Sequence, residues 1–388
     1  MNNLKVSIAG LGIAAAMFTA CTSEHQTAVT VSGLNPAAFD SVINGKKTAL
    51  YTLTNKSGME VCITNFGGRV VSIVVPDKDG NPTDVVLGYD NLAQYADTVN
   101  SPSDFGSSVG RYANRINKGR LTVEGKEYQL PQNNFGHCLH GGPSGWIYQV
   151  YDAEQPNDST LKLTIVSPDG DNGFPGTVTA TTTYTLLNNN TLDISFDATT
   201  DKETVINMTN HSYFNLNGGP STEGMDMVLY INADNYTPAD STYMTTGEIS
   251  PVEGTPMDFR TPRALEQTVN DTTFEQIRNA SGYDHNWCLN TYKDGKGDDK
   301  TVAASLYSPK TGIFLEMFTN EPGVQVYTGN FQGTGVSCKH GVKYPKHVSV
   351  CLESQKYPDS PNKKDWPSPY LKPGEKYHSH VAYKFSVK

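Results

Sequence analysis

Two side chains of this sequence could move protons near neutral pH. His211 follows the alternating run 204–208 and precedes the turn signal 217–220, which predicts a strand with a histidine at its end. Glu353 follows the mostly apolar run 348–352, where a carboxylate without a partner would be costly. An imidazole gives or takes protons near pH 7, and a carboxylate can accept one. The alternative roles are a structural histidine and a buried ion pair.

Polar side chains in two further segments could bind a substrate. Segment 109–119 carries Arg111 and Arg115 between flanking glycines, which favour an irregular backbone over a helix. A guanidinium offers a rigid fork of donors that suits both carboxylates and vicinal hydroxyls, so a structural salt bridge competes with ligand binding. His140 precedes the turn 141–143. Hydrogen bonding is favoured over metal binding there, because no second cluster completes a ligand set.

Two more polar positions occur between apolar residues. Asp258 stands between two apolar residues, and its carboxylate could cap the segment 262–265 or accept hydrogen bonds from hydroxyls. Gln325 and Tyr327 fall on one face of the predicted strand 323–330, because side chains alternate along a strand.

The elements that must position these residues are mainly strands. The run 178–187 turns into 192–196, and the run 303–307 turns into 313–318, as in antiparallel hairpins. Residues 91–95 form the first plausible helical turn. This rhythm predicts an all-β fold, a large antiparallel β-sandwich with a few short helices.

Composition limits the classes of function. The 388 residues are 37% hydrophobic, enough for a large core, and no interdomain linker interrupts residues 34–388, which we assign to a single domain. The net charge of −10 argues against nucleic acid as a partner. The sequence has no glycine-rich phosphate loop and no Gly-x-Ser-x-Gly motif.

The first residues are typical of an export signal. Lys5 precedes an apolar run that ends at Phe18, and small residues precede Cys21. We therefore expect a lipoprotein-type signal peptide over 1–20 and a polar tether over 21–33, with a lipid on Cys21 as the sole membrane attachment. The protein would then face the periplasm or the cell surface of a bacterium. Phe18 stands three places before Cys21, where a lipoprotein signal usually has an aliphatic residue, so cleavage by a general signal peptidase stays open. The other alternative is a cytoplasmic protein with an apolar start.

Five motifs occur in one order along the chain: Gly110–Ile116, Leu139–Gly142, Asn210–Leu216, Gly323–Asn330 and Tyr344–Glu353. Together they resemble the aldose 1-epimerase (galactose mutarotase) family over residues 34–388. The resemblance implies a β-super-sandwich with an open cleft. It also implies interconversion of the α and β anomers of free aldohexoses such as galactose and glucose.

The resemblance also implies roles for single residues. Glu353 matches the general base and His211 the general acid, while His140 matches a second histidine that holds the substrate. The positions that match binders of sugar hydroxyls are Asn114, Arg115, Tyr213, Asp258 and Gln325. No metal or other cofactor is needed for catalysis. Bound Ca²⁺ is known in some relatives, but no ligand set in this sequence marks a site. The chain is expected to act as a monomer.

The chemistry agrees with these roles. Opening a hemiacetal ring requires a base for the anomeric hydroxyl and an acid for the ring oxygen. We expect Glu353 and His211 on opposite sides of the sugar. Three other functions stay open: a non-catalytic carbohydrate-binding lipoprotein, a glycoside hydrolase that uses Asp258 and Glu353, and a hexose-phosphate epimerase, for which no phosphate-binding cluster is evident.

Overall fold

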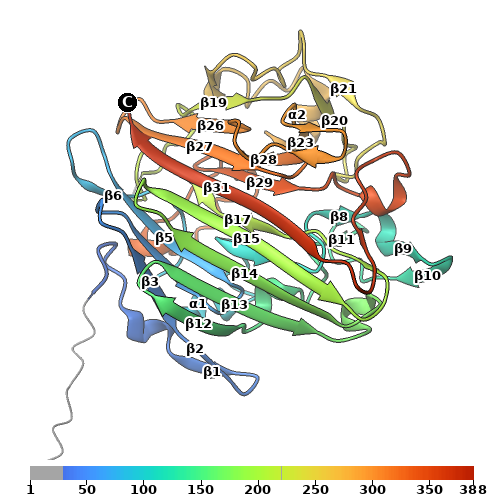
Figure 1. Cartoon of the computed structure of the whole chain (residues 1–388). Helices are drawn as coiled ribbons and strands as arrows, with labels where there is room; N and C mark the ends of the chain where they lie inside the picture. The colour runs from blue at the N-terminus through green and yellow to red at the C-terminus, as the bar shows by residue number, and fades with distance from the viewer. Residues whose placement is uncertain (1–28, 220) are drawn as a thin grey trace, which may run out of the picture.

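A computed structural model describes residues 29–219 and 221–388 (Figure 1). Every ladder between named strands is antiparallel, and the described part has two α-helices, α1 (Leu92–Ala96) and α2 (Glu275–Ala280). Helix α1 matches the predicted helical turn, whereas α2 was not predicted from the sequence. The predicted fold class, an antiparallel β-sandwich with a few short helices, is confirmed.

A nine-stranded sheet forms the face that Figure 1 presents to the viewer. The predicted ribbon at 178–196 is its central hairpin, with Val178 opposite Thr200 and Leu186 opposite Leu192. The C-terminal strand, β31 (Tyr377–Val387), lies between β15 (Thr191–Thr200) of this hairpin and β27 (Ile313–Thr319). It therefore joins the two halves of the sheet. In order across the sheet, the strands are β12 (Asp152–Asn157), β13 (Thr160–Ser167), β14 (Val178–Leu186), β15 (Thr191–Thr200), β31 (Tyr377–Val387), β27 (Ile313–Thr319), β26 (Ala304–Tyr307), β19 (Val228–Ile231) and β22 (Arg263–Ala264).

A six-stranded sheet packs behind it. The hydroxyl of Tyr383 on β31 donates a hydrogen bond of 2.7 Å to the carbonyl of Leu352, and residues of both sheets share the main hydrophobic core. All residues of two adjacent strands of this sheet, β29 (Val350–Gln355) and β28 (Gly323–Tyr327), are buried. Its strands, in order, are β18 (Tyr213–Phe214), β29 (Val350–Gln355), β28 (Gly323–Tyr327), β23 (Asp284–Cys288), β20 (Asn235–Thr237) and β21 (Ser250–Pro251).

Smaller ladders complete the fold. Two of them carry the segments that the sequence marked for binding: β7 (Ser107–Val109) pairs with β17 (Thr209–His211), and β8 (Arg115–Ile116) pairs with β11 (Cys138–Leu139). A four-stranded sheet contains β3 (Leu50–Thr54), β4 (Glu60–Thr64), β5 (Arg69–Pro76) and β6 (Pro82–Asp84). The remaining pairs are β1 (Ser41–Ile43) with β2 (Lys46–Thr48), β9 (Arg120–Val123) with β10 (Lys126–Gln129), β16 (Thr204–Val205) with β30 (Tyr370–Leu371), and β24 (Tyr292–Lys293) with β25 (Lys296–Gly297).

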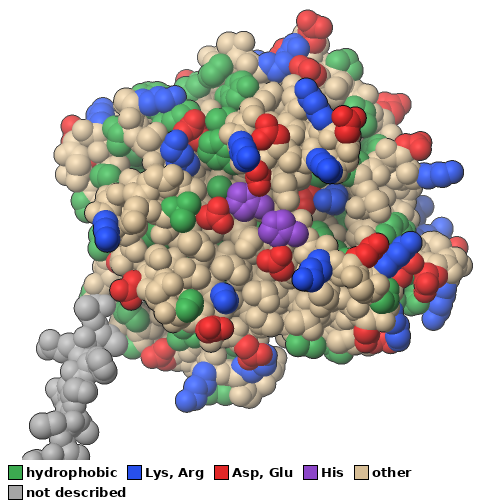
Figure 2. All heavy atoms as spheres, viewed as in Figure 1, with side chains coloured by type: hydrophobic (Ala, Val, Ile, Leu, Met, Phe, Trp, Pro, Cys, Tyr) green, Lys and Arg blue, Asp and Glu red, His purple; other side chains and the backbone are tan. Residues whose placement is uncertain are grey.

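The outer face of the nine-stranded sheet carries two histidine–carboxylate pairs, one exposed and one half-buried. Histidine side chains stand among acidic ones near the middle of this face (Figure 2). His378 Nδ1 lies 2.9 Å from Asp197 Oδ1, and His380 Nε2 lies 2.8 Å from Asp193 Oδ2. Exposed pairs of this kind contribute little to stability.

The predicted signal segment 1–20 and the lipidation site Cys21 lie outside the described residues, so export stays a prediction. At the end of the predicted tether, residues 30–33 form a turn that contacts the fold, and the amide of Val31 donates to Glu60 Oε1 at 2.8 Å. In the part of the chain that the structure describes, no helix is long and apolar enough to cross a membrane.

Candidate active site

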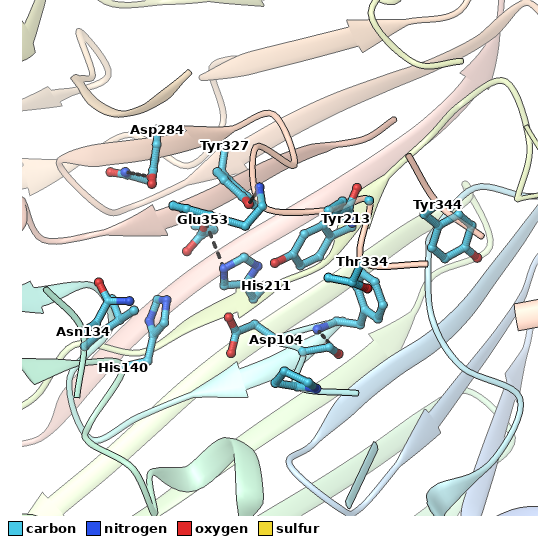
Figure 3. A pocket seen from close by; sticks show the side chains of 18 of the residues that line it. Asp104, Asn134, His140, His211, Tyr213, Asp284, Tyr327, Thr334, Tyr344 and Glu353 are labelled. Atoms are coloured by element: carbon cyan, nitrogen blue, oxygen red, sulfur yellow. Dashed lines mark hydrogen bonds and ion pairs between the residues drawn. The ribbon is translucent and has the colours of Figure 1, made fainter. Parts of the chain in front are cut away.

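A pocket of about 300 Å³ gathers the residues that the sequence marked (Figure 3). Its volume is at the lower end of the range for small-molecule sites. The ends of β17, β28 and β29 form one wall, and the loops around β8 and β11 form another. Every predicted catalytic or binding residue except Asp258 lines it: Asn114, Arg115, His140, His211, Tyr213, Gln325 and Glu353.

The two predicted proton-transfer residues form a buried pair. His211 Nε2 lies 3.5 Å from Glu353 Oε1, and the side chains are only 5% and 3% exposed. His211 ends β17, and Glu353 lies on β29, opposite Gln325 of β28. The two side chains are therefore neighbours on one wall, not on opposite sides of the pocket as we expected. This arrangement suits a sugar, because the two oxygens that exchange protons, O1 and O5, are both bonded to the same carbon, C1.

Each member of this pair has a free hydrogen-bonding atom. Among the described residues, neither Glu353 Oε2 nor His211 Nδ1 has a hydrogen-bond partner, although both are buried. Such atoms are rare in folded proteins and are often explained by a functional role. The His211 ring stacks on Tyr213, with centroids 4.9 Å apart and an angle of 17° between the planes. The stacking fixes the direction in which the imidazole faces the pocket.

The second histidine has a defined protonation pattern. His140 Nδ1 accepts a hydrogen bond of 3.1 Å from the amide of Asn114, and the amide of His140 donates to the Asn114 carbonyl at 3.1 Å. A neutral imidazole that accepts at Nδ1 must carry its proton on Nε2, so His140 is a donor toward the pocket. Burial lowers the pKa of His140 to about 3, which keeps the ring neutral.

Arg115 has an amide partner in place of the competing salt bridge. Its Nε and Nη2 donate to Asn134 Oδ1 at 3.1 and 2.9 Å, and among the described residues no carboxylate lies within ion-pair distance of it. A neutral partner leaves the positive charge of this buried guanidinium available to a ligand. Arg111 is different, because its two Nη atoms bind the carbonyls of Ser167, Pro175 and Gly176 and hold the fold together.

Asp258 does not belong to the pocket, and another aspartate does. Asp258 is bound by Arg260, with Nη2 to Oδ2 at 2.8 Å and Nε to Oδ1 at 3.0 Å. Asp284 lines the pocket instead and accepts a hydrogen bond of 2.7 Å from Gln325 Nε2. The sequence signal that we overlooked is its place as the first residue of the strand that pairs with the strand of Gln325.

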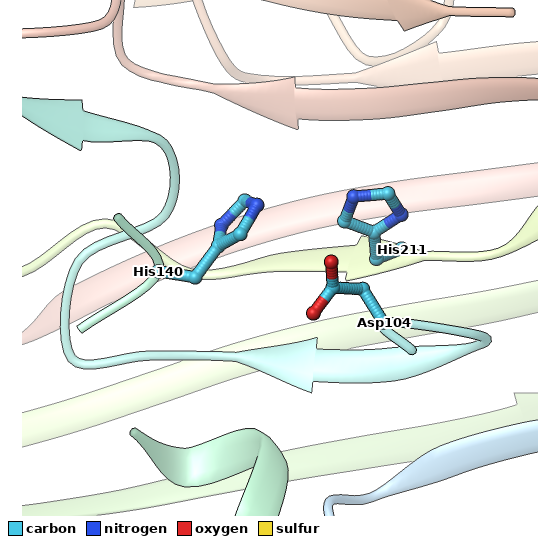
Figure 4. A group of neighbouring side chains, drawn as sticks. All are labelled: Asp104, His140 and His211. Carbon is cyan, nitrogen blue, oxygen red and sulfur yellow. The ribbon is translucent and has the colours of Figure 1, made fainter. Parts of the chain in front are cut away.

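A third carboxylate was also missed. Asp104 lies in the loop before β7, and its carboxylate lies beside both His140 and His211 (Figure 4), with one carboxylate oxygen and one ring nitrogen of each histidine within 4.8 Å of one another. Burial lowers the pKa of His211, and the negative charge of Asp104 opposes this by raising it. Burial, followed by the charges of Asp284 and Asp104, raises the pKa of Glu353 well above its usual value. Burial thus disfavours the charged form of both members of the pair.

Two groups of side chains come close enough to suggest a metal site. One consists of Asp104, His140 and His211, and the other of His211, Cys351 and Glu353, with candidate ligand atoms within 4.8 Å of one another. Ca²⁺ requires six or more oxygen ligands, and each group offers a single carboxylate. In addition, His140 Nε2 carries a proton and has no lone pair for a metal. These residues do not fit a calcium ion.

Comparison with known proteins agrees with the fold. The family model of aldose 1-epimerase matches residues 49–384. Galactose mutarotase from Rattus norvegicus is 40% identical over 85% of this chain and 92% of the relative, and aldose 1-epimerase from Escherichia coli is 37% identical over 88% and 96%. The crystal structure of an aldose epimerase homologue from C. elegans has a TM-score of 0.80 at 28% identity and covers 88% of this chain and 99% of the other. The chain belongs to the aldose 1-epimerase family of isomerases.

Proposed function

We propose that this protein interconverts the α and β anomers of free aldohexoses such as galactose and glucose, with Glu353 as the base and His211 as the acid. The observation that carries the proposal is the buried pair of His211 Nε2 and Glu353 Oε1, 3.5 Å apart at the wall of a sugar-sized pocket. Two neighbouring proton-transfer groups suit the two oxygens, O1 and O5, that are bonded to one anomeric carbon.

The reaction proceeds in two halves. Glu353 accepts the proton of the O1 hydroxyl while His211 donates a proton to O5, and the C1–O5 bond breaks as the C1–O1 bond becomes a carbonyl. Rotation about C1–C2 then turns the other face of the carbonyl toward O5. In the second half His211 takes the proton back from O5, which attacks C1, and Glu353 returns a proton to O1. Assistance of this kind is typically worth about 10²–10⁴-fold in rate, and it needs no cofactor.

The other lining residues would hold the sugar in place. Arg115 offers guanidinium donors, and His140 offers Nε2–H as a neutral donor. Asp284 and Gln325, joined at 2.7 Å, offer acceptors and donors for neighbouring hydroxyls. Asn114 contributes to this wall through its hydrogen bonds to His140 and to the amide of Arg115. A hexose bound by these groups has its C1 facing the His211–Glu353 pair.

The alternative functions have less support. A glycoside hydrolase that uses Asp258 and Glu353 needs both carboxylates beside one glycosidic bond, and Asp258 does not line the pocket. A non-catalytic sugar-binding protein has no use for a buried pair of proton-transfer groups. Both alternatives predict no exchange between anomers.

The test is ¹H NMR of freshly dissolved α-glucose and α-galactose, which follows the appearance of the β anomer. The wild type should bring both sugars to equilibrium far faster than buffer alone, and Glu353→Gln should lose this activity while it stays folded. Asp258→Asn is the matched control, because it removes a carboxylate charge outside the pocket and should leave the rate within about twofold. A wild-type protein that does not exceed the buffer rate overturns the proposal.

A further inference from the structure

A cysteine lies beside the proton-transfer pair. Cys351 is two residues before Glu353 on β29, so the two side chains are on the same face of the strand. The Cys351 thiol, a carboxylate oxygen of Glu353 and a ring nitrogen of His211 all lie within 4.8 Å of one another, and all three residues are buried. We call these three residues the His–Cys–Glu cluster. Of the five cysteines in the described part of the chain, only Cys351 belongs to a group of this kind.

The spacing within the cluster suits a tetrahedral metal ion. Two ligand atoms of a tetrahedral zinc ion are about 3.4–3.6 Å apart, because its bonds to nitrogen, oxygen and sulfur are about 2.0–2.3 Å long. His211 Nε2 and Glu353 Oε1 already have this separation, 3.5 Å, and face each other in the pocket (Figure 3). The Cys351 thiol needs a shift of no more than about 1 Å to reach the same ion. The fourth position is left to a water molecule or a sugar hydroxyl from the pocket.

The charges around the cluster also favour a divalent cation. The charged side chains that line the pocket are one guanidinium, Arg115, and three carboxylates, Asp104, Asp284 and Glu353. A thiolate and a carboxylate together neutralise Zn²⁺, so the bound ion brings no net charge into the buried site. Among the described residues, Glu353 Oε2 and His211 Nδ1 are buried without a hydrogen-bond partner, and an ion is one common explanation of such atoms.

The chemistry of the ligands decides which ion fits. Zn²⁺ accepts thiolate and imidazole ligands, whereas Ca²⁺ and Mg²⁺ bind oxygen. The neighbouring group of Asp104, His140 and His211 offers no sulfur, and His140 Nε2 carries a proton because Nδ1 accepts the amide of Asn114. The His–Cys–Glu cluster is therefore the better set of zinc ligands.

We propose that the His–Cys–Glu cluster binds one zinc ion and that the bound ion inhibits anomer exchange. The Cys351 thiol loses its proton to water when the ion binds, because a metal-bound cysteine is a thiolate. The ion then occupies the lone pair of His211 and the carboxylate of Glu353, so neither side chain can transfer a proton to the sugar. The inhibition rests on the proposed function, whereas the binding of zinc does not.

Cobalt reports thiolate ligation directly. Co²⁺ occupies zinc sites of this kind and gives an intense charge-transfer band in the near ultraviolet when a thiolate is among its ligands. The wild type should develop this band with a single Co²⁺ ion per chain, and Zn²⁺ should abolish it. A wild type without the band overturns the inference, and this measurement needs no variant.

Cysteine variants locate the site. Cys351→Ser should lack the cobalt band. Cys338→Ser is the matched control and should keep it, because Cys338 also lines the pocket but belongs to no group of metal-ligating side chains in the described part. Loss of even an outer-shell partner typically costs about 10–100-fold in metal affinity, so Cys351→Ser should weaken zinc binding by at least about tenfold. A coloured zinc chelator used as a competitor measures this affinity. Equal zinc affinity in Cys351→Ser and the wild type overturns the inference.

Inhibition is measured with the same variants and α-glucose. Zinc should slow exchange by the wild type and by Cys338→Ser, a chelator should restore the rate, and Ca²⁺ should have no effect. Half-inhibition of Cys351→Ser should require at least about tenfold more zinc. Equal inhibition of Cys351→Ser and the wild type overturns the inference alone. Absence of exchange with every sugar overturns the proposed function, and the cobalt band then decides whether the metal site exists.

Discussion

The molecule holds histidine–carboxylate pairs in two contrasting regions. On the outer face of the nine-stranded sheet, His378 and Asp197 are 2.9 Å apart with side chains 55% and 57% exposed. In the pocket, His211 and Glu353 are farther apart, at 3.5 Å, but almost completely buried. The closer pair is thus the one exposed to water, where its charges are screened. Burial changes the proton affinity of the pocket pair, because it lowers the pKa of His211 and raises the pKa of Glu353.

The largest expected effect comes from breaking the buried pair. Glu353→Gln keeps the shape of the side chain but cannot accept the O1 proton, so the rate of anomer exchange should fall by about 10²–10⁴-fold. His211→Asn should cause a loss of similar size, because it removes the acid. Polarimetry of α-galactose measures both variants, and circular dichroism checks that they are folded. A variant that keeps more than a tenth of the wild-type rate contradicts the assigned role of that residue.

A smaller effect is expected at the guanidinium beside the pair. Arg115→Lys keeps the positive charge but loses the planar fork that binds Asn134 and faces the pocket. We expect KM for glucose to rise about tenfold, with a smaller change in kcat. Initial rates over a range of sugar concentrations separate the two parameters. An unchanged KM would show that Arg115 does not contact the substrate.

The charge of Asp104 should be visible in the pH dependence. Glu353 must be ionised and His211 protonated for the first half of the reaction, so the rate should fall at both low and high pH. Asp104 raises the pKa of both groups. Asp104→Asn should therefore shift both limbs of the pH profile to lower pH, and above neutral pH the rate should fall. Limbs that stay at the wild-type pH would exclude an electrostatic role for Asp104.

The smallest effect is expected on the exposed face. His378→Asn and His380→Asn remove pairs on the outer face whose residues do not line the pocket, and exchange rates should stay within about twofold of the wild type. Thermal unfolding of the same variants should also change little. A large loss of activity in either variant would show that burial does not distinguish the two regions.

Sequence patterns predicted the local parts of this structure well. The alternating run 178–187 and its partner became β14 and β15, because alternation reports one buried face of a sheet. The position of β31 between β15 and β27 depends on pairing across most of the chain, and no local pattern contains that information. Helix α2 was missed because it is short and has no side-chain cap.

The residues that line the pocket could be predicted where a side chain of suitable chemistry fell within one of the sequence motifs. His211 was recognisable as a histidine at the end of a predicted strand and Glu353 as a carboxylate after a mostly apolar run, and both line the pocket. The choice between Asp258 and Asp284 depends on strand register, which places Asp284 opposite Tyr327 on β28. Asp104 is near the two histidines only because β7 pairs with β17, so its proximity is a property of the fold.

The most direct test of the central claim is the rate of anomer exchange in the double variant Glu353→Gln/His211→Asn, measured beside each single variant by ¹H NMR. If the two side chains act together on one anomeric centre, the double variant should be about as slow as the slower single variant, because either loss disables the pair. Losses that multiply in the double variant would show that the two residues act independently and would contradict the account.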